Sequence, residues 1–89
     1  MAKVVVSLKI LPSDVSVDLN ALKTKIEKSL PKYASVHKFA EDPIAFGLVA
    51  LIAHIVVPEE TGGGLDEIEK LLKGMDEISE LETLMVRRV

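Results

Sequence analysis

Histidine and serine side chains mark the few positions at which this chain could do chemistry. His37 and His54 lie in separate stretches, and neither has a cysteine, histidine or carboxylate at the spacing that metal ligands need. Ser7, Ser13 and Ser35 lack the histidine and aspartate partners that activate a nucleophile. We therefore expect no metal site and no enzymatic activity, and we expect each histidine to lie on the face of a sheet.

A glycine run over residues 62–64 has one feature of a phosphate-binding turn. Such a turn before a helix can hold a phosphate through its backbone N–H groups. No lysine or serine accompanies the run, and Glu59 and Glu60 would repel an anion. We therefore interpret it as a flexible turn and expect no cofactor in this chain.

Composition indicates one folded domain over residues 1–89. The hydrophobic fraction of 48% suits a packed core, and 89 residues leave no room for a second one. A net charge of -3 argues against a nucleic-acid binder, which needs clustered lysine and arginine. The absence of cysteine fits a cytoplasmic protein. The uncharged run from Pro43 to Pro58 is too short to cross a membrane, which takes about 20 apolar residues.

Hydrophobic periodicity predicts three elements in the first half of the chain. Residues 3–11 alternate as a strand, with one covered face and one mostly solvated face. After Asp18, a good N-cap, apolar residues recur at helical spacing up to Leu30. Residues 35–41 have the pattern of a second strand. The sequence therefore begins with the order strand, helix, strand.

Three further elements complete the pattern. Residues 48–57 are apolar on both faces and rich in β-branched side chains, as in a central strand. A second helix follows over residues 65–73, and residues 81–89 form a last strand whose poor alternation leaves its register open. The residues of this helix expected to face the core are Leu65, Ile68, Leu71 and Leu72.

The order β-α-β-β-α-β fits a ferredoxin-like α+β sandwich. This fold has a four-stranded antiparallel sheet, with the first and third strands at its centre and both helices on one face. An RNA-binding sheet of this topology needs stacking aromatics on its open face, and the first and third strands contain none. The fold alone does not decide the function, because it hosts enzymes, sensors and binding proteins.

The segment Pro43-Ile44-Ala45-Phe46-Gly47 separates two strands. Proline fixes one backbone angle and glycine frees another, so we expect a turn. Phe46, one of only two phenylalanines, is either a core residue or the tip of a recognition loop. Arg87 and Arg88 end a half of the chain that is otherwise acidic, and they either contact a partner or keep the protein soluble.

Residues 41–58, the turn after them, the helix sequence LDEIEKLL and the final VRRV together resemble translation elongation factor 1-beta in its short archaeal form. Members of that family are guanine nucleotide exchange factors for elongation factor 1-alpha, the GTPase that delivers aminoacyl-tRNA. The resemblance covers the whole chain. It implies elongation factor 1-alpha as the partner, which itself holds GDP or GTP and magnesium, with no direct contact to nucleic acid.

The resemblance also implies the site. Phe46 resembles the aromatic that docks on the GTPase. Eukaryotic members carry a penultimate lysine that reaches toward the magnesium and phosphate end of the nucleotide site, and Arg88 stands at that position here. The partner-binding residues predicted in this way are Pro43, Ile44, Phe46, Gly47, Arg87 and Arg88.

A second reading is a small-molecule-sensing module of the ACT type, and a third is a structural interaction module. ACT-type sensors pair side by side and bind an amino acid between them. A glycine-rich turn after the first strand would favour that reading, whereas this chain has Pro12-Ser13-Asp14 there. A tight dimer that binds an amino acid would support the sensor. A monomer that co-elutes with elongation factor 1-alpha would support exchange.

Overall fold

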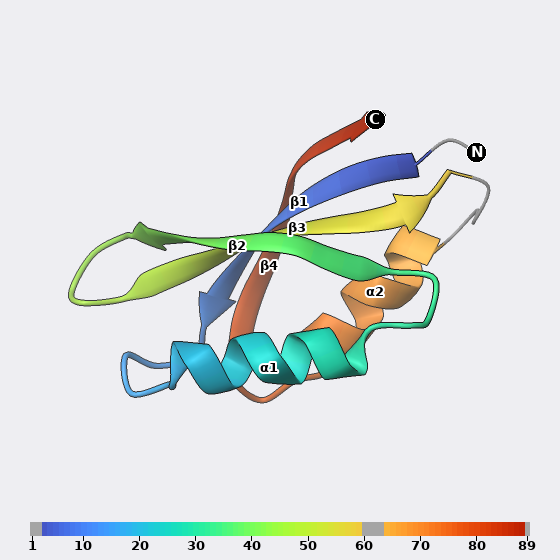
Figure 1. Ribbon diagram of the computed structural model, residues 1–89. Coiled ribbons are helices and arrows are strands. Elements are labelled where there is room, and N and C mark those ends of the chain that lie inside the picture. The colour runs from blue at the N-terminus through green and yellow to red at the C-terminus, as the bar shows by residue number, and fades with distance from the viewer. Residues whose placement is uncertain (1–2, 60–63, 89) are drawn as a thin grey trace.

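The computed structural model describes residues 3–59 and 64–88 (Figure 1). Gly62 and Gly63 of the glycine run lie outside these ranges. The helices and strands follow the predicted order, with small changes at their ends. They are β1 (Lys3–Pro12), α1 (Leu19–Ser29), β2 (Ser35–Pro43), β3 (Val49–Pro58), α2 (Gly64–Lys73) and β4 (Ile78–Arg88). No helix in the described part of the chain is long and apolar enough to cross a membrane.

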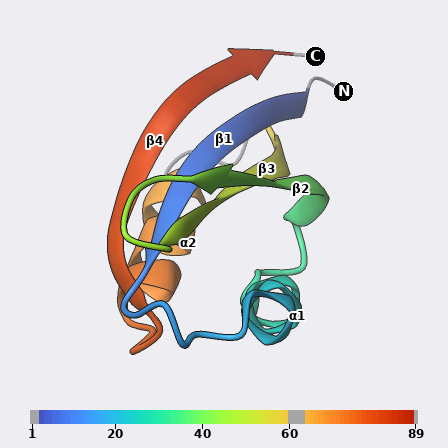
Figure 2. The same ribbon diagram turned by 90° about the vertical axis from the view of Figure 1, so that its left-hand side faces the viewer.

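The four strands form one antiparallel sheet in the order β2-β3-β1-β4. The predicted central position of residues 48–57 is confirmed, because β3 lies between β2 and β1. Both helices cover the same face of the sheet, and the opposite face is open (Figures 1 and 2). The ferredoxin-like α+β fold is therefore confirmed.

The hydrophobic core lies between the sheet and the two helices. Leu22 and Ile26 of α1 and Ile68 and Leu72 of α2 are buried against it. Leu71 is 39% exposed, so its predicted inward orientation is wrong. Successive helical residues are rotated by about 100°, which turns Leu71 away from the stripe that Ile68 and Leu72 present. The strand residues of the core are Val6, Leu8, Ile10, Leu51, Ala53, Ile55, Val57 and Ile78.

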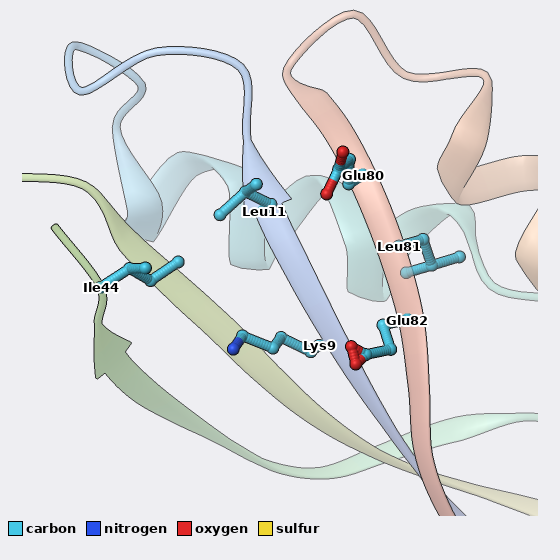
Figure 3. A pocket seen from close by; sticks show the side chains of 6 residues that line it. All are labelled: Lys9, Leu11, Ile44, Glu80, Leu81 and Glu82. Carbon is cyan, nitrogen blue, oxygen red and sulfur yellow. The ribbon is translucent and has the colours of Figure 1, made fainter.

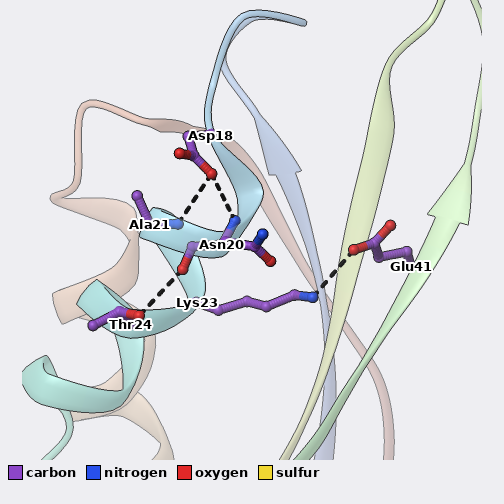
Figure 4. Close-up of polar contacts among 6 residues, drawn as sticks. All are labelled: Asp18, Asn20, Ala21, Lys23, Thr24 and Glu41. Atoms are coloured by element: carbon purple, nitrogen blue, oxygen red, sulfur yellow. Dashed lines mark hydrogen bonds and ion pairs between the residues drawn. The ribbon is translucent and has the colours of Figure 1, made fainter.

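Polar contacts fix α1 at its start and along its length (Figure 4). The Asp18 carboxylate accepts hydrogen bonds from the backbone N–H groups of Asn20 (3.0 Å) and Ala21 (3.2 Å), as predicted for an N-cap. Such a cap stabilises a helix by about 1 kcal/mol. Lys23 Nζ lies 3.1 Å from Glu41 Oε2 and so ties α1 to β2, two residues before Pro43. Both contacts help to hold the strand that leads into the next loop.

The open face of β1 is less exposed than predicted. Val5 and Ser7 point to this face, yet each is only 8% exposed. β1 is a central strand, so side chains of β3 and β4 cover it from both sides. Alternation in the sequence therefore identifies the face on which a residue lies, but not how deeply it is buried there.

Extra residues interrupt the regular pairing of both edge strands. Ser7 pairs with Met85 and Leu8 with Thr83, which makes Leu84 the extra residue of a bulge in β4. The pairing of β2 with β3 passes over His37, and that of β1 with β4 passes over Ser79, in the same way. A bulge shifts the alternation by one residue. This shift explains the poor alternation that the sequence of β4 shows.

Candidate functional site

The loop between β2 and β3 is a tight turn built around Phe46 and Gly47. The Ile44 N–H donates to the Leu48 carbonyl and the Leu48 N–H donates to the Ala45 carbonyl, each at 2.9 Å. Phe46 has φ 55° and Gly47 has φ 78°. Positive φ at both central residues is the pattern of a type I′ turn, which favours asparagine or glycine at these positions. The predicted turn is present, with a bulky residue where a small one is usual.

Phe46 is fully exposed, at 101% of its reference surface. The core alternative left open by the sequence is therefore wrong. A non-glycine residue in the left-handed region costs about 1–2 kcal/mol. Because the exposed ring makes no compensating contact in the core, the isolated protein gains nothing from phenylalanine at this position.

Two further apolar side chains are exposed near this turn. Val15, in the loop before α1, is 60% exposed, and Ile44 is 46% exposed. The two loops touch, since a Cβ added at Gly47 would lie 4.0 Å from Val15 Cγ1. We call Val15, Ile44 and Phe46 the apolar tip. Our sequence reasoning missed Val15, although an apolar residue within the polar segment Ser13-Asp14-Val15-Ser16 was the available signal.

A pocket of about 360 Å³ lies on the open face beside the apolar tip (Figure 3). Ile44, Leu11 and Leu81 contribute apolar walls, and the charged lining consists of Lys9, Glu80 and Glu82. Lys9 Nζ also lies 3.7 Å from Asp42 Oδ2, next to the start of the turn. This lining of apolar and mainly acidic side chains suits an apolar side chain of another molecule that carries a positive charge close by. It contains no nucleophile or base–nucleophile pair.

The two arginines at the end of β4 have different surroundings. The Arg88 guanidinium forms an ion pair with the carboxylate of Glu59, at the end of β3. Arg87 lies on the open face and lines a pocket there together with His54 and Val56. Within the described ranges, Arg87 forms no ion pair. Of the two predicted cations, Arg87 is therefore the one that has no ion-pair partner among the described residues.

Both histidines lie on the open face, as predicted. His54 Nδ1 is 2.8 Å from Ser7 Oγ. Burial lowers the pKa of His54 below its usual 6.5, and the positive charges of Lys38, Arg87 and His37 lower it further. The described residues contain no group of three or more histidine, cysteine or acidic side chains that could hold a metal ion.

Comparison with known proteins shows the family of the chain. Residues 5–89 match the family described as the EF-1 guanine nucleotide exchange domain. The chain belongs to this family. Elongation factor 1-beta of Staphylothermus marinus is 44% identical over 89 residues, which cover 100% of this chain and 99% of that protein. The protein of the same name from Methanothermobacter thermautotrophicus is 42% identical with the same coverage, and that from Aeropyrum pernix is 43% identical.

A solved structure shares the fold. The C-terminal domain of the MgtC protein from Mycobacterium tuberculosis superimposes with a TM-score of 0.61 over 92% of this chain and 85% of that chain. Its sequence identity is 12%, so the likeness extends to the fold alone.

In this member of the EF-1 exchange-domain family, the predicted site residues form two separate groups. Pro43 pairs with Val49 at one end of the sheet, and Val4 pairs with Arg88 at the other. The six residue steps of β1 from Val4 to Ile10 alone span about 20 Å, and the longest dimension of the molecule is 42 Å. The turn and the arginines therefore lie at opposite ends of the sheet (Figure 1).

Proposed function

We propose that this protein is a guanine nucleotide exchange factor that promotes replacement of GDP by GTP on elongation factor 1-alpha. Membership of the EF-1 exchange-domain family supports the proposal. The observation that carries it is the complete exposure of Phe46 at a strained backbone position. Such a residue destabilises the free protein, and a partner that buries it explains its presence.

Docking would begin at the apolar tip. Burying a phenylalanine side chain contributes about 1.5–3 kcal/mol, and each 1.4 kcal/mol or so corresponds to a tenfold change in affinity. Phe46 alone would therefore strengthen binding by about ten- to a hundredfold. Val15 and Ile44 extend the apolar area around it. The proposal thus assigns the affinity for the GTPase mainly to this end of the molecule.

Nucleotide release would be promoted at the opposite end. A factor that binds the empty GTPase better than the GDP-bound form must weaken GDP binding by the same factor, because the two equilibria are linked. A guanidinium brought near the magnesium and phosphate groups would compete with the metal electrostatically. Arg88 would first have to leave Glu59, whereas Arg87 has no such pair to break in the part of the chain that the structure describes. The two arginines therefore differ: Arg88 is held in an ion pair in the free protein, and Arg87 would be the first to approach the phosphates.

This mechanism needs no bond-making by the protein and no cofactor of its own. GDP, GTP and magnesium belong to the partner. Because the two ends are separated by the length of the sheet, the GTPase would have to contact them through two distant parts of its surface. The proposal therefore requires a partner large enough to span the open face or one side of the molecule.

The decisive experiment measures release of fluorescent GDP from elongation factor 1-alpha, with this protein in catalytic amounts and unlabelled nucleotide in excess. We expect faster release that rises with the concentration of the protein. Leu71→Ala, which removes an exposed apolar side chain from α2 that belongs neither to the apolar tip nor to the arginine pair, is the matched control and should accelerate release as the wild type does. An unchanged rate with folded protein and active GTPase would refute the proposal.

A further inference from the structure

The open face of the sheet holds a second pocket, at the end where β1 begins and β4 ends. Its volume is about 470 Å³, and Val5 and Val56 form its apolar part. All four strands contribute to its lining. We call this site the basic pocket. Its nitrogen-bearing side chains are Lys3, His37, Lys38, His54 and Arg87.

The described residues provide no ion-pair partner for the cations of the basic pocket. Its lining holds three permanent cations and no carboxylate, although the chain as a whole carries a net charge of -3. Lys3, Lys38 and Arg87 form no ion pair with any residue in the ranges 3–59 and 64–88. Cations gathered in this way repel one another, and an anion placed among them would remove that repulsion. The pocket therefore favours a negatively charged occupant.

The bulge in β2 places two of these side chains in the pocket. Consecutive residues of a regular strand point to opposite faces of the sheet. His37 and Lys38 nevertheless line the same pocket, because the pairing steps from Val36 directly to Lys38 and leaves His37 as the extra residue. The bulge thus adds a second nitrogen-bearing side chain from one strand. Without it, one of the two would lie on the helix-covered face.

Ser7 holds the His54 ring. Ser7 Oγ is 2.8 Å from Nδ1 of His54, and Ser7 is 8% exposed. When the neutral ring accepts the Ser7 hydroxyl proton at Nδ1, its own proton is on Nε2. The protonated ring also carries a proton on Nε2. In both states His54 therefore keeps one N–H donor that Ser7 does not use.

From this arrangement we propose that the basic pocket is a binding site for a phosphate-type oxyanion, with the diphosphate group as its preferred form. Arg87 presents the planar donor fork that suits phosphate oxygens, and the lysines act as point charges. Two strands lie between β2 and β4, so a diphosphate, which is longer than a single carboxylate and carries more oxygens, is better able to meet cations from both. The proposal concerns this protein alone, so its test needs no GTPase.

The test follows the ring protons of His37 and His54 by NMR while inorganic diphosphate is added at low ionic strength. We expect saturable shifts of both rings and a rise in the pKa of His54, because the anion offsets the neighbouring positive charges. Lys38→Gln should weaken binding about tenfold, since one charge-assisted contact is lost. Lys28→Gln is the matched control, because it removes an exposed lysine from α1, and it should bind as the wild type does.

Parallel titrations with GDP and with guanosine identify the source of the anion. Equal binding of diphosphate and GDP would show that the site reads the phosphates alone, and tighter binding of GDP would show that it takes a nucleotide. Either result supports the proposal. Shifts reproduced by sodium chloride at the same ionic strength, or unchanged in Lys38→Gln, would overturn it. A response to a glutamate-rich peptide without one to diphosphate would also overturn it, in favour of an acidic protein surface.

Discussion

The two ends of the sheet differ in the physical means by which they prepare a contact. The apolar tip exposes Phe46 on a turn with two positive φ angles and uses no charge. The opposite end gathers cations through strand alternation and a bulge, around the apolar side chains of Val5 and Val56. Hydrophobic contact acts at short range and is not screened by salt, whereas charge acts over about 10 Å and is screened. In the proposed mechanism, the molecule would thus separate docking at one end from electrostatic action at the other.

The largest effect is expected when the aromatic ring at the apolar tip is removed without adding backbone strain, because this tests the role of that end directly. Phe46→Gly removes the docking side chain and also suits the φ of 55°. We expect catalytic efficiency in GDP exchange to fall about ten- to a hundredfold, from the lost burial. We expect the melting temperature to stay equal or to rise by a few degrees, because about 1 kcal/mol of strain is relieved.

Calorimetry and the exchange assay on the same Phe46→Gly sample test both parts of this prediction. Leu71→Ala serves as the control for loss of an exposed apolar side chain. A variant that exchanges normally would show that the ring does not dock. A marked loss of stability would show that Phe46 supports the fold.

Removing Arg88 and Val89 tests the other end. We expect the affinity for the empty GTPase to change little, while GDP release slows by about tenfold, the size of one charge-assisted contact. Stopped-flow release and binding titrations separate the two effects. The difference should shrink at high salt, because screening weakens the cation but not the ring. If the truncation lowered the affinity for the GTPase and the rate of GDP release by the same factor, both ends would contribute to docking alone.

A substitution at Gly47, next to Phe46, tests whether the turn needs a positive φ at this position. Gly47 has φ 78°, and a Cβ there would meet Val15 Cγ1 only at 4.0 Å, so space is available and the backbone angle is the obstacle. We expect Gly47→Ala to destabilise the protein by about 1 kcal/mol, a drop of roughly 4–8 °C in melting temperature. Thermal unfolding measures it. An unchanged melting temperature would show that the turn adapts without strain.

The smallest expected effect concerns pH. Because the pKa of folded His54 lies below 6.5, the unfolded chain binds a proton first as the pH falls. Stability is therefore highest above pH 6.5 and declines toward the lowered pKa, below which the loss stops growing. Denaturant unfolding across this window should show the slope, and His54→Gln should reduce it. A hydrogen bond from Lys25 lowers the pKa of the Glu77 carboxyl below its usual 4.5. A slope of opposite sign would contradict the cause given for His54.

Local patterns in the sequence were enough to predict the element order, the Asp18 cap and the turn at Phe46. Each depends on neighbours within a few residues, such as the hydrogen bonds from Asn20 and Ala21 to Asp18. The bulges at His37 and Leu84 were not predictable, because an extra residue is defined only against the strand beside it.

The candidate site was predictable only in part, for the same reason. Val15 reaches the apolar tip across a loop contact, and Arg88 meets Glu59 across the sheet. Neither contact can be predicted from the spacing of residues along the sequence. That Phe46 is exposed rather than buried depends on the whole fold. Whether the predicted partner-binding residues contact a GTPase stays a prediction.

The bulges have a further consequence at the borders of the sheet. β2 and β4 are its two outer strands, and each carries at least one bulge as well as charged residues. A straight, uncharged border offers free N–H and C=O groups on which another molecule can add a strand, and this is a common start of aggregation. The interruptions at His37, Ser79 and Leu84 break that row of groups. The same irregularities that direct side chains onto the open face therefore also hinder edge-to-edge polymerisation of the protein.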